Sequence, residues 1–218
     1  KVSGIINGTT NYILSRMDKE GVNYAEVLKD AQVLGYAESD PAADVEGSDA
    51  ADKIAILSGL AFGGAINRAN IPTTGINLLE DIDVNYARKL GYGIKLLAIS
   101  EKGETQSSRE DSQPLSVWVE PTLVPEDNPL AGVNGVNNAI LVEGNPIGQV
   151  MFFGPGAGSG PTASAVVADI LNIAGIQSMS ENKVLNLDPL LSAKSWRSCH
   201  VSEKKQITKK NYIRLIAE

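Results

Sequence analysis

Hydrophobic residues recur at helical spacing through the first half of the chain and form strand-like runs through the second half. Helical spacing predicts helices over Thr10–Asp18, Tyr24–Leu34 and Ser48–Gly63, and INLLEDIDVNYARKLGY predicts a short helix that ends at Gly91. Runs rich in β-branched and aliphatic residues predict strands at the opening KVSGIING and then at IKLLAIS, LSVWVEPTLV, NAILVEG and IGQVMFF. Turn sequences such as EKGE, GVNG and EGNP separate the later strands.

This order of elements predicts an α/β fold of the α+β type. Strands that follow each other directly, joined by short turns, pair antiparallel. We therefore expect a mixed, largely antiparallel sheet that is covered by helices on one face. The apolar side chains on the second face of such a sheet must be buried by another part of the protein or by another subunit.

The acidic run from Gly35 to Lys53 is the main candidate for chemistry. Six carboxylates lie in it, those of Glu38, Asp40, Asp44, Glu46, Asp49 and Asp52. Asp49 and Lys53 are four residues apart on a helix that is otherwise apolar on most sides, so they share one face at the edge of a packed core. An amine placed there is a candidate proton donor or acceptor. The alternative is an ordinary structural ion pair, worth a few tenths of a kcal/mol.

Several motifs resemble the substrate-binding part of homoserine dehydrogenase. They are GIINGTTNYIL, LGYAESDPAADVEGSDAADK, VEPTLVPEDNPLAGVNGVNNAILVEG and GPGAGSGPTASAVVADI, and the resemblance covers residues 1–176. The family interconverts L-homoserine and L-aspartate 4-semialdehyde with NAD or NADP, in threonine and methionine biosynthesis. The resemblance thus implies an oxidoreductase.

The resemblance also implies roles for individual residues. Lys53, which closes the DAADK segment, resembles the family's acid/base residue at the substrate oxygen. Glu38 and Asp49 resemble the residues that hold the amino and hydroxyl ends of homoserine. These residue types suit the reaction, because oxidising an alcohol requires removal of its hydroxyl proton and a zwitterionic amino acid needs an anion for its ammonium group.

Further positions resemble the surroundings of that site. Asp44 looks like another member of the polar cluster, and Tyr36 and Thr9 look like pocket lining. Gly35 and Gly158 fall where the family brings its backbone against the cofactor. The resemblance also implies a homodimer, because a second subunit covers the open face of the sheet in this family.

The dinucleotide-binding signature of a complete enzyme is missing from the opening of this chain. A strand, a G-x-G-x-x-G turn and a helix would be expected, and the glycines at 154, 156, 158 and 160 do not have that spacing. We therefore expect an excised, inactive piece of a larger enzyme. Its predicted parts are the substrate and catalytic domain at 1–153, a glycine-rich turn and helix returning to the nucleotide-binding domain at 154–176, a linker at 177–210 and a truncated first strand of an ACT-like domain at 211–218.

Composition narrows the remaining function classes. A net charge of −7 and a pI near 4.8 argue against a nucleic-acid surface and fit a cytoplasmic protein. No apolar stretch is long enough for a membrane span, and no signal-peptide pattern opens the chain. Cys199 and His200 are the single residues of their types, so we expect no disulfide, no metal site and no catalytic role for either.

Two function classes remain open at this level. In the first, the chain is an oxidoreductase fragment whose Glu38, Asp49 and Lys53 face a pocket. In the second, it is a non-catalytic substrate-binding or oligomerisation module in which the same charges form a structural network.

Overall fold

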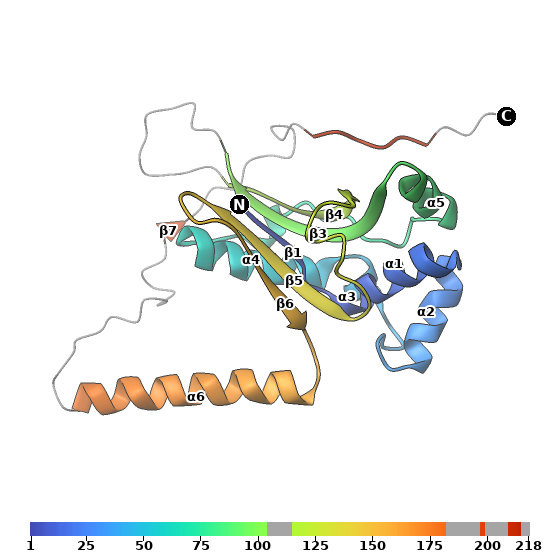
Figure 1. Ribbon diagram of the computed structural model, residues 1–218. Helices are drawn as coiled ribbons and strands as arrows, with labels where there is room; N and C mark the ends of the chain where they lie inside the picture. Colours follow the sequence, from blue (N-terminus) through green and yellow to red (C-terminus); the bar gives the residue numbers. More distant parts are fainter. Residues whose placement is uncertain (104–114, 182–196, 199–208, 215–218) are drawn as a thin grey trace.

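A five-stranded antiparallel sheet forms the centre of the structure, a computed structural model that describes residues 1–103, 115–181, 197–198 and 209–214 (Figure 1). The strand order is β4-β3-β1-β5-β6, and every neighbouring pair in it is antiparallel. The bounds are β1 Val2–Ile5, β3 Tyr92–Lys102, β4 Leu115–Pro125, β5 Asn137–Gly144 and β6 Gly148–Pro155. A separate parallel pair joins β2 (Gly64–Ala65) to β7 (Arg197–Ser198). The predicted mixed, largely antiparallel arrangement is confirmed.

The helices follow the predicted order with shifted ends. Their bounds are α1 Gly8–Glu20, α2 Tyr24–Val33, α3 Ala42–Val45, α4 Ser48–Phe62, η1 Arg68–Asn70, α5 Asp81–Lys89 and α6 Ser159–Glu181. The single turn α3 lies in the acidic run, between the helices predicted over Tyr24–Leu34 and Ser48–Gly63. The opening strand is shorter than predicted because the side chain of Asn7 already caps α1. Helix α6 continues past the predicted domain boundary at residue 176.

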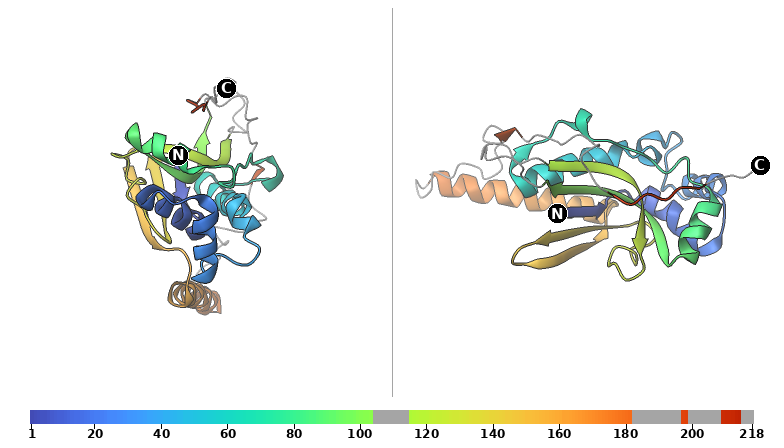
Figure 2. Two further views of the ribbon diagram at one scale, coloured as in Figure 1. Left: turned by 90° about the vertical axis from the view of Figure 1, so that its right-hand side faces the viewer. Right: turned by 90° about the horizontal axis from the view of Figure 1, so that it is seen from above.

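Helices cover one face of the sheet, as predicted (Figures 1 and 2). Alternate strand residues such as Leu96 and Ala98 pack there in one apolar core with Ile13 of α1 and Ile54 of α4. This core fixes the position of α4 over the end of β1. The start of α4, which carries Asp49 and Lys53, is therefore held against the sheet.

The second face of the sheet is partly covered by the chain itself. Leu97 and Trp118 form a second buried cluster there, together with Leu130 and Val133 from the loop between β4 and β5. Cover is incomplete at the edge strand β6, where Met151 and Phe153 are 39% and 59% exposed. An apolar edge of this kind is typical of a surface that meets another protein.

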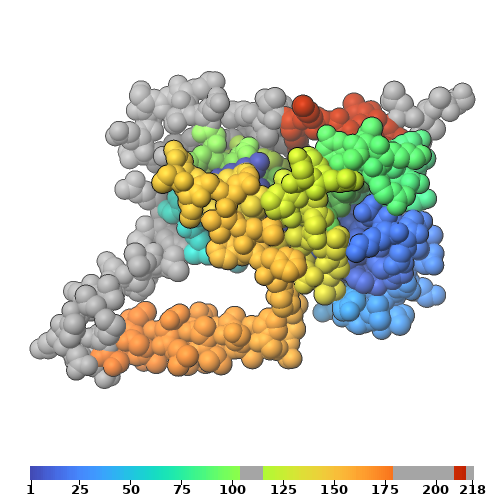
Figure 3. Space-filling view, in the orientation of Figure 1, coloured from blue at the N-terminus to red at the C-terminus, as the bar shows by residue number. Residues whose placement is uncertain are grey.

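Helix α6 extends away from the rest of the described chain (Figures 1 and 3). Every residue from Ser159 to Ser178 is exposed. Its large apolar side chains lie all round the helix, at Val166, Val167, Ile170, Leu171, Ile173 and Ile176. A helix that is apolar all round is normally buried, so α6 has the surface of a buried helix in an exposed position.

Residues 209–214 run beside β4 and α5 (Figure 1). Lys209 pairs with Glu120 of β4, and Arg214 bonds Glu80 at 2.9 Å beside α5. The segment is held by side chains and lies in no strand, whereas a strand is predicted from residue 211. Residues 215–218, most of the predicted linker, Cys199 and His200 lie outside the described residues.

Candidate functional site

The acidic run meets the end of β1 at a cluster of polar side chains. Asp44 comes from α3, and Asp49 and Lys53 come from the first two turns of α4. Gly47 joins the two helices with φ +85°, and a side chain at this position would lie 3.1 Å from Thr73 Cγ2. Only glycine suits that backbone, which turns α3 and α4 so that their carboxylates face the same point.

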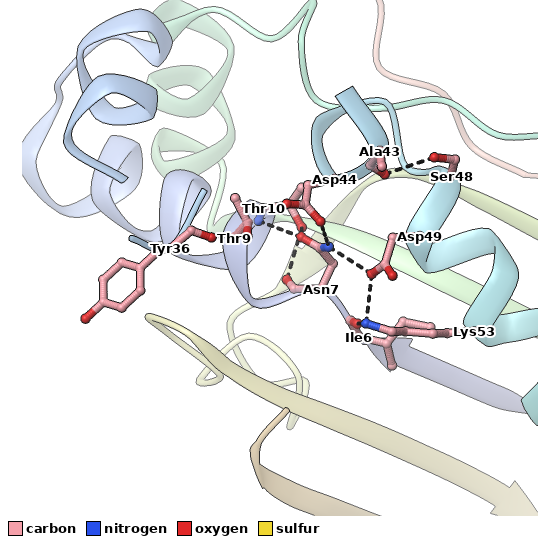
Figure 4. Close-up of polar contacts among 10 residues, drawn as sticks. All are labelled: Ile6, Asn7, Thr9, Thr10, Tyr36, Ala43, Asp44, Ser48, Asp49 and Lys53. Carbon is pink, nitrogen blue, oxygen red and sulfur yellow. Dashed lines mark hydrogen bonds and ion pairs between the residues drawn. The ribbon is translucent and has the colours of Figure 1, made fainter. Parts of the chain in front are cut away.

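A continuous chain of hydrogen bonds links these residues (Figure 4). Asn7 Nδ2 donates to Asp44 Oδ1 at 2.6 Å and to Asp49 Oδ2 at 3.0 Å. Lys53 Nζ donates to the same Asp49 oxygen at 2.8 Å and to the Ile6 carbonyl at 3.2 Å. Asp49 therefore lies between an amide and an ammonium group, and its position is fixed from both sides.

Asn7 belongs to this site although the sequence analysis did not select it. It lies 37 and 42 positions before its two carboxylate partners, so no local pattern indicates these contacts. The available signal is its place three residues before the predicted helix over Thr10–Asp18, because asparagine is a favoured N-cap. That signal predicts the cap and leaves the contacts to Asp44 and Asp49 unknown.

The cluster is open to solvent on one side. The side chain of Lys53 is 46% exposed and that of Asp49 is 31% exposed, so screening keeps this ion pair weak as a source of stability. Two carboxylates and one ammonium group leave the cluster with excess negative charge. The negative charge attracts a cationic group of a ligand. The ammonium group of Lys53 is the group of the cluster that can donate a proton.

A cleft of about 490 Å³ opens beside Lys53. One wall comes from Ile6 and from Ile56 and Leu57 of α4, and the other comes from residues 138–140 and 152–156 of β5 and β6. Gly156 packs closely on Asn138 within this second wall, where a Cβ on the glycine would lie 1.8 Å from Asn138 Nδ2. The glycine-rich turn thus brings bare backbone to the cleft of the lysine.

The remaining predicted site residues lie around the cluster without joining it. Thr9 donates its hydroxyl to the Tyr36 carbonyl at 2.6 Å, and the ring of Tyr36 points away from Asp49 (Figure 4). Glu38 is exposed, and its carboxylate has no hydrogen-bond partner within residues 1–103, 115–181, 197–198 and 209–214.

Gly35 and Gly158 are likewise not in the cluster. Gly35 follows α2 with φ +77°, and Gly158 precedes α6 with φ +114°. The structure therefore brings Asp44, Asp49 and Lys53 together, and Lys53 lines the cleft together with Gly154 and Gly156.

Neither a metal cluster nor a membrane span occurs in the described part of the chain. No group of three histidine, cysteine or acidic side chains there could hold a metal ion. None of the described helices is both long and apolar enough to cross a membrane.

Comparison with known proteins gives a consistent result. The family model for homoserine dehydrogenase matches residues 1–171. A homoserine dehydrogenase of Synechocystis sp. is 53% identical over 99% of this chain and 48% of its own length. One from Bacillus subtilis is 45% identical over 79% of this chain and 38% of its own length.

Solved structures agree with the sequence relatives. A homoserine dehydrogenase from Thiobacillus denitrificans has a TM-score of 0.83 and 41% identity, over 93% of this chain and 45% of that one. A hyperthermophilic archaeal homoserine dehydrogenase in complex with NADPH has a TM-score of 0.62 and 30% identity, over 78% of this chain and 46% of that one. The chain spans about half the length of the relatives it matches. It belongs to the homoserine dehydrogenase family.

Proposed function

We propose that this chain supplies the substrate-binding half of a homoserine dehydrogenase, which interconverts L-homoserine and L-aspartate 4-semialdehyde with NAD or NADP in cytoplasmic threonine and methionine biosynthesis. The observation that carries the proposal is the ammonium group of Lys53, held by Asp49 at the mouth of a cleft. Family membership supports the reaction, and the geometry supports the assignment of residues.

In this proposal Lys53 moves the proton at the substrate oxygen. Oxidation of homoserine removes a hydroxyl proton, and reduction of the aldehyde needs a proton for the developing alkoxide. Lys53 Nζ also donates to the Ile6 carbonyl, which holds the amine at the cleft in both directions of the reaction. Its positive charge stabilises the oxyanion before the proton moves.

The carboxylates bind and orient the amino acid. Asp49 lies at the hydroxyl end of homoserine in this proposal, because its carboxylate accepts a hydrogen bond from Lys53. Asp44 adds negative charge beside it. Glu38 takes the substrate ammonium, which its unpartnered exposed carboxylate is free to meet among the described residues. Thr9 and Tyr36 line the adjoining part of the substrate pocket in this proposal. The Thr9 hydroxyl donates a hydrogen bond to the Tyr36 carbonyl and so joins the two residues.

The nicotinamide fits the far wall of the cleft. Gly154 and Gly156 line the cleft there and have no side chains, so a ligand can approach the backbone closely. Gly158 and Gly35 are further backbone positions proposed to contact the cofactor. When bound, the cofactor accepts or supplies the hydride. Exclusion of water and orientation of the substrate oxygen are the tasks of Lys53 and the cleft walls.

We further propose that a nucleotide-binding domain outside these residues packs on α6. The exposed apolar side chains of this helix support the idea, because contact between so much apolar surface and water is unfavourable.

A second copy of the chain is proposed to cover the apolar edge at β6. A Met151→Glu change should then convert a dimer into a monomer in light scattering, whereas Tyr86→Glu on α5 should not.

The decisive test joins this chain to the nucleotide-binding part of the Synechocystis relative and measures homoserine-dependent reduction of NAD⁺ and NADP⁺. Lys53→Met should lower kcat by about 100-fold or more, the usual range for loss of an acid/base group. Lys89→Met, on the exposed surface of α5, is the control and should keep full activity. A hybrid enzyme that is folded and inactive with both cofactors would favour the non-catalytic module, and an active Lys53→Met variant would remove the lysine from the mechanism.

A further inference from the structure

Asn7 uses every polar atom of its side chain, and it is only 5% exposed. Its Oδ1 accepts hydrogen bonds from the backbone N–H and the hydroxyl of Thr10, both at 2.9 Å. Because an N–H must point to an oxygen, these contacts fix which way the amide is turned. Nδ2 then has to face the carboxylates, and its two hydrogens go one each to Asp44 and Asp49.

We propose that Asn7 is a positioning residue that holds Asp44 and Asp49 side by side and keeps Asp49 aligned on Lys53. Two carboxylates at one point repel each other, and a shared amide donor gives each of them a separate hydrogen bond. The anchor of that donor is the N-terminus of α1, a buried helix in the core. The fixed position of α1 therefore also fixes Asp49, and through Asp49 it fixes Lys53.

This inference rests on the proposed function, because it assigns a role in the same reaction. The simpler explanation is that Asn7 only caps α1 and that its contacts with the carboxylates have no effect on the reaction. The two explanations differ in which atom matters. A cap needs the oxygen, whereas positioning of the carboxylates needs the amide N–H groups.

Two substitutions separate these atoms. Asn7→Asp keeps a cap oxygen, replaces the amide nitrogen by an oxygen and faces Asp44 and Asp49 with a third carboxylate. Asn7→Ala removes both the cap and the donor. Asn23 offers a matched control, because it caps α2 through the same atom, accepting from Glu26 N at 3.0 Å, and it is exposed and has no carboxylate contact among the described residues.

The experiment makes Asn7→Asp, Asn7→Ala, Asn23→Asp and Asn23→Ala in the hybrid enzyme and measures kcat, the KM for homoserine and the thermal midpoint of each. Both Asn7 variants should lose about 10- to 100-fold in kcat, the scale of a small misplacement of a catalytic group. Asn23→Ala should lose thermal stability like Asn7→Ala and keep its kcat. The comparison of the two alanine variants decides the matter even if Asn7→Asp does not fold.

The inference is overturned if Asn7→Ala keeps its kcat below its melting temperature, or if Asn23→Ala loses as much kcat as Asn7→Ala. A change confined to the KM for homoserine would also overturn it, because positioning of the lysine acts on the chemical step. Failure of the proposed function has a different signature. In that case the unmodified hybrid enzyme is folded and shows no homoserine-dependent reduction of either cofactor.

Discussion

Lys95 should make this protein more stable as the pH rises above neutrality. Its side chain enters the structure from β3 and is only 4% exposed. The ammonium group donates to the Val133 carbonyl and to the side-chain oxygens of Asn11 and Asn134. All three acceptors are neutral, so the buried charge has hydrogen bonds without a contacting counter-ion. This arrangement ties the loop between β4 and β5 to α1.

Burial lowers the pKa of Lys95 from 10.5 to about 8, Asp18 opposes the change by attraction and Lys19 adds to it by repulsion. Above pH 8 the folded chain therefore loses a proton that the unfolded chain still holds up to about pH 10.5. The unfolded state binds more protons in this window, so the free energy of unfolding increases with pH. Linkage gives a gain of about 1.4 kcal/mol between pH 7 and pH 9, or a tenfold change in the folding equilibrium.

Urea unfolding at pH 7, 8 and 9 measures this gain, with Lys95→Met as the variant that cannot titrate. The free energy of unfolding of the parent minus that of the variant should rise by about 1.4 kcal/mol over the range. Lys102→Met, at the exposed end of the same strand, should leave the parent's pH dependence unchanged. A difference for Lys95→Met that stays flat or falls with pH would refute the reasoning, whatever the absolute stability of the variant.

The structure supports two further predictions. Gly75→Ala would place a Cβ 2.0 Å from the Val45 carbonyl oxygen, so unfolding should become easier by about 3 kcal/mol in urea, while Gly93→Ala, with no atom within 4 Å, should change little. Glu120→Gln should weaken the hold on Lys209 and speed tryptic cleavage after that residue several-fold, and equal cleavage rates in parent and variant would show that the ion pair does not anchor the segment.

The order of the helices and strands could be predicted because their apolar spacing is long and regular. The helix over Ser48–Phe62 and the paired strands at residues 92–102 and 115–125 have this property. Helix α3 has only four residues, too short for a periodic signal, so no helix is predicted there. The length of α6 was also underestimated, since an exposed helix with apolar residues all round has no one-sided pattern to mark its end.

The site was predictable only where its contacts are local. The pair of Asp49 and Lys53 lies one helical turn apart, and their spacing alone placed them on one face. The contacts of Asn7 depend on how β1, α3 and α4 pack, which spacing cannot express. Family resemblance selected Glu38 and Tyr36 as well, and the structure leaves both side chains outside the hydrogen-bonded cluster.

The cleft beside Lys53 brings together two groups of residues that lie far apart in the sequence, the charged cluster and the glycine-rich turn. Its first wall is α4, fixed by the apolar core, and its second wall is the end of β6, which runs directly into the exposed helix α6. A domain that packs on α6 would therefore be only a few residues of backbone away from Gly154 and Gly156. The lysine side of the site is built into the core of this chain, whereas the glycine side lies at the edge strand of the sheet, next to the start of α6. In the proposed enzyme, binding of homoserine should therefore respond to changes at Asp49, and binding of the nucleotide to changes on α6.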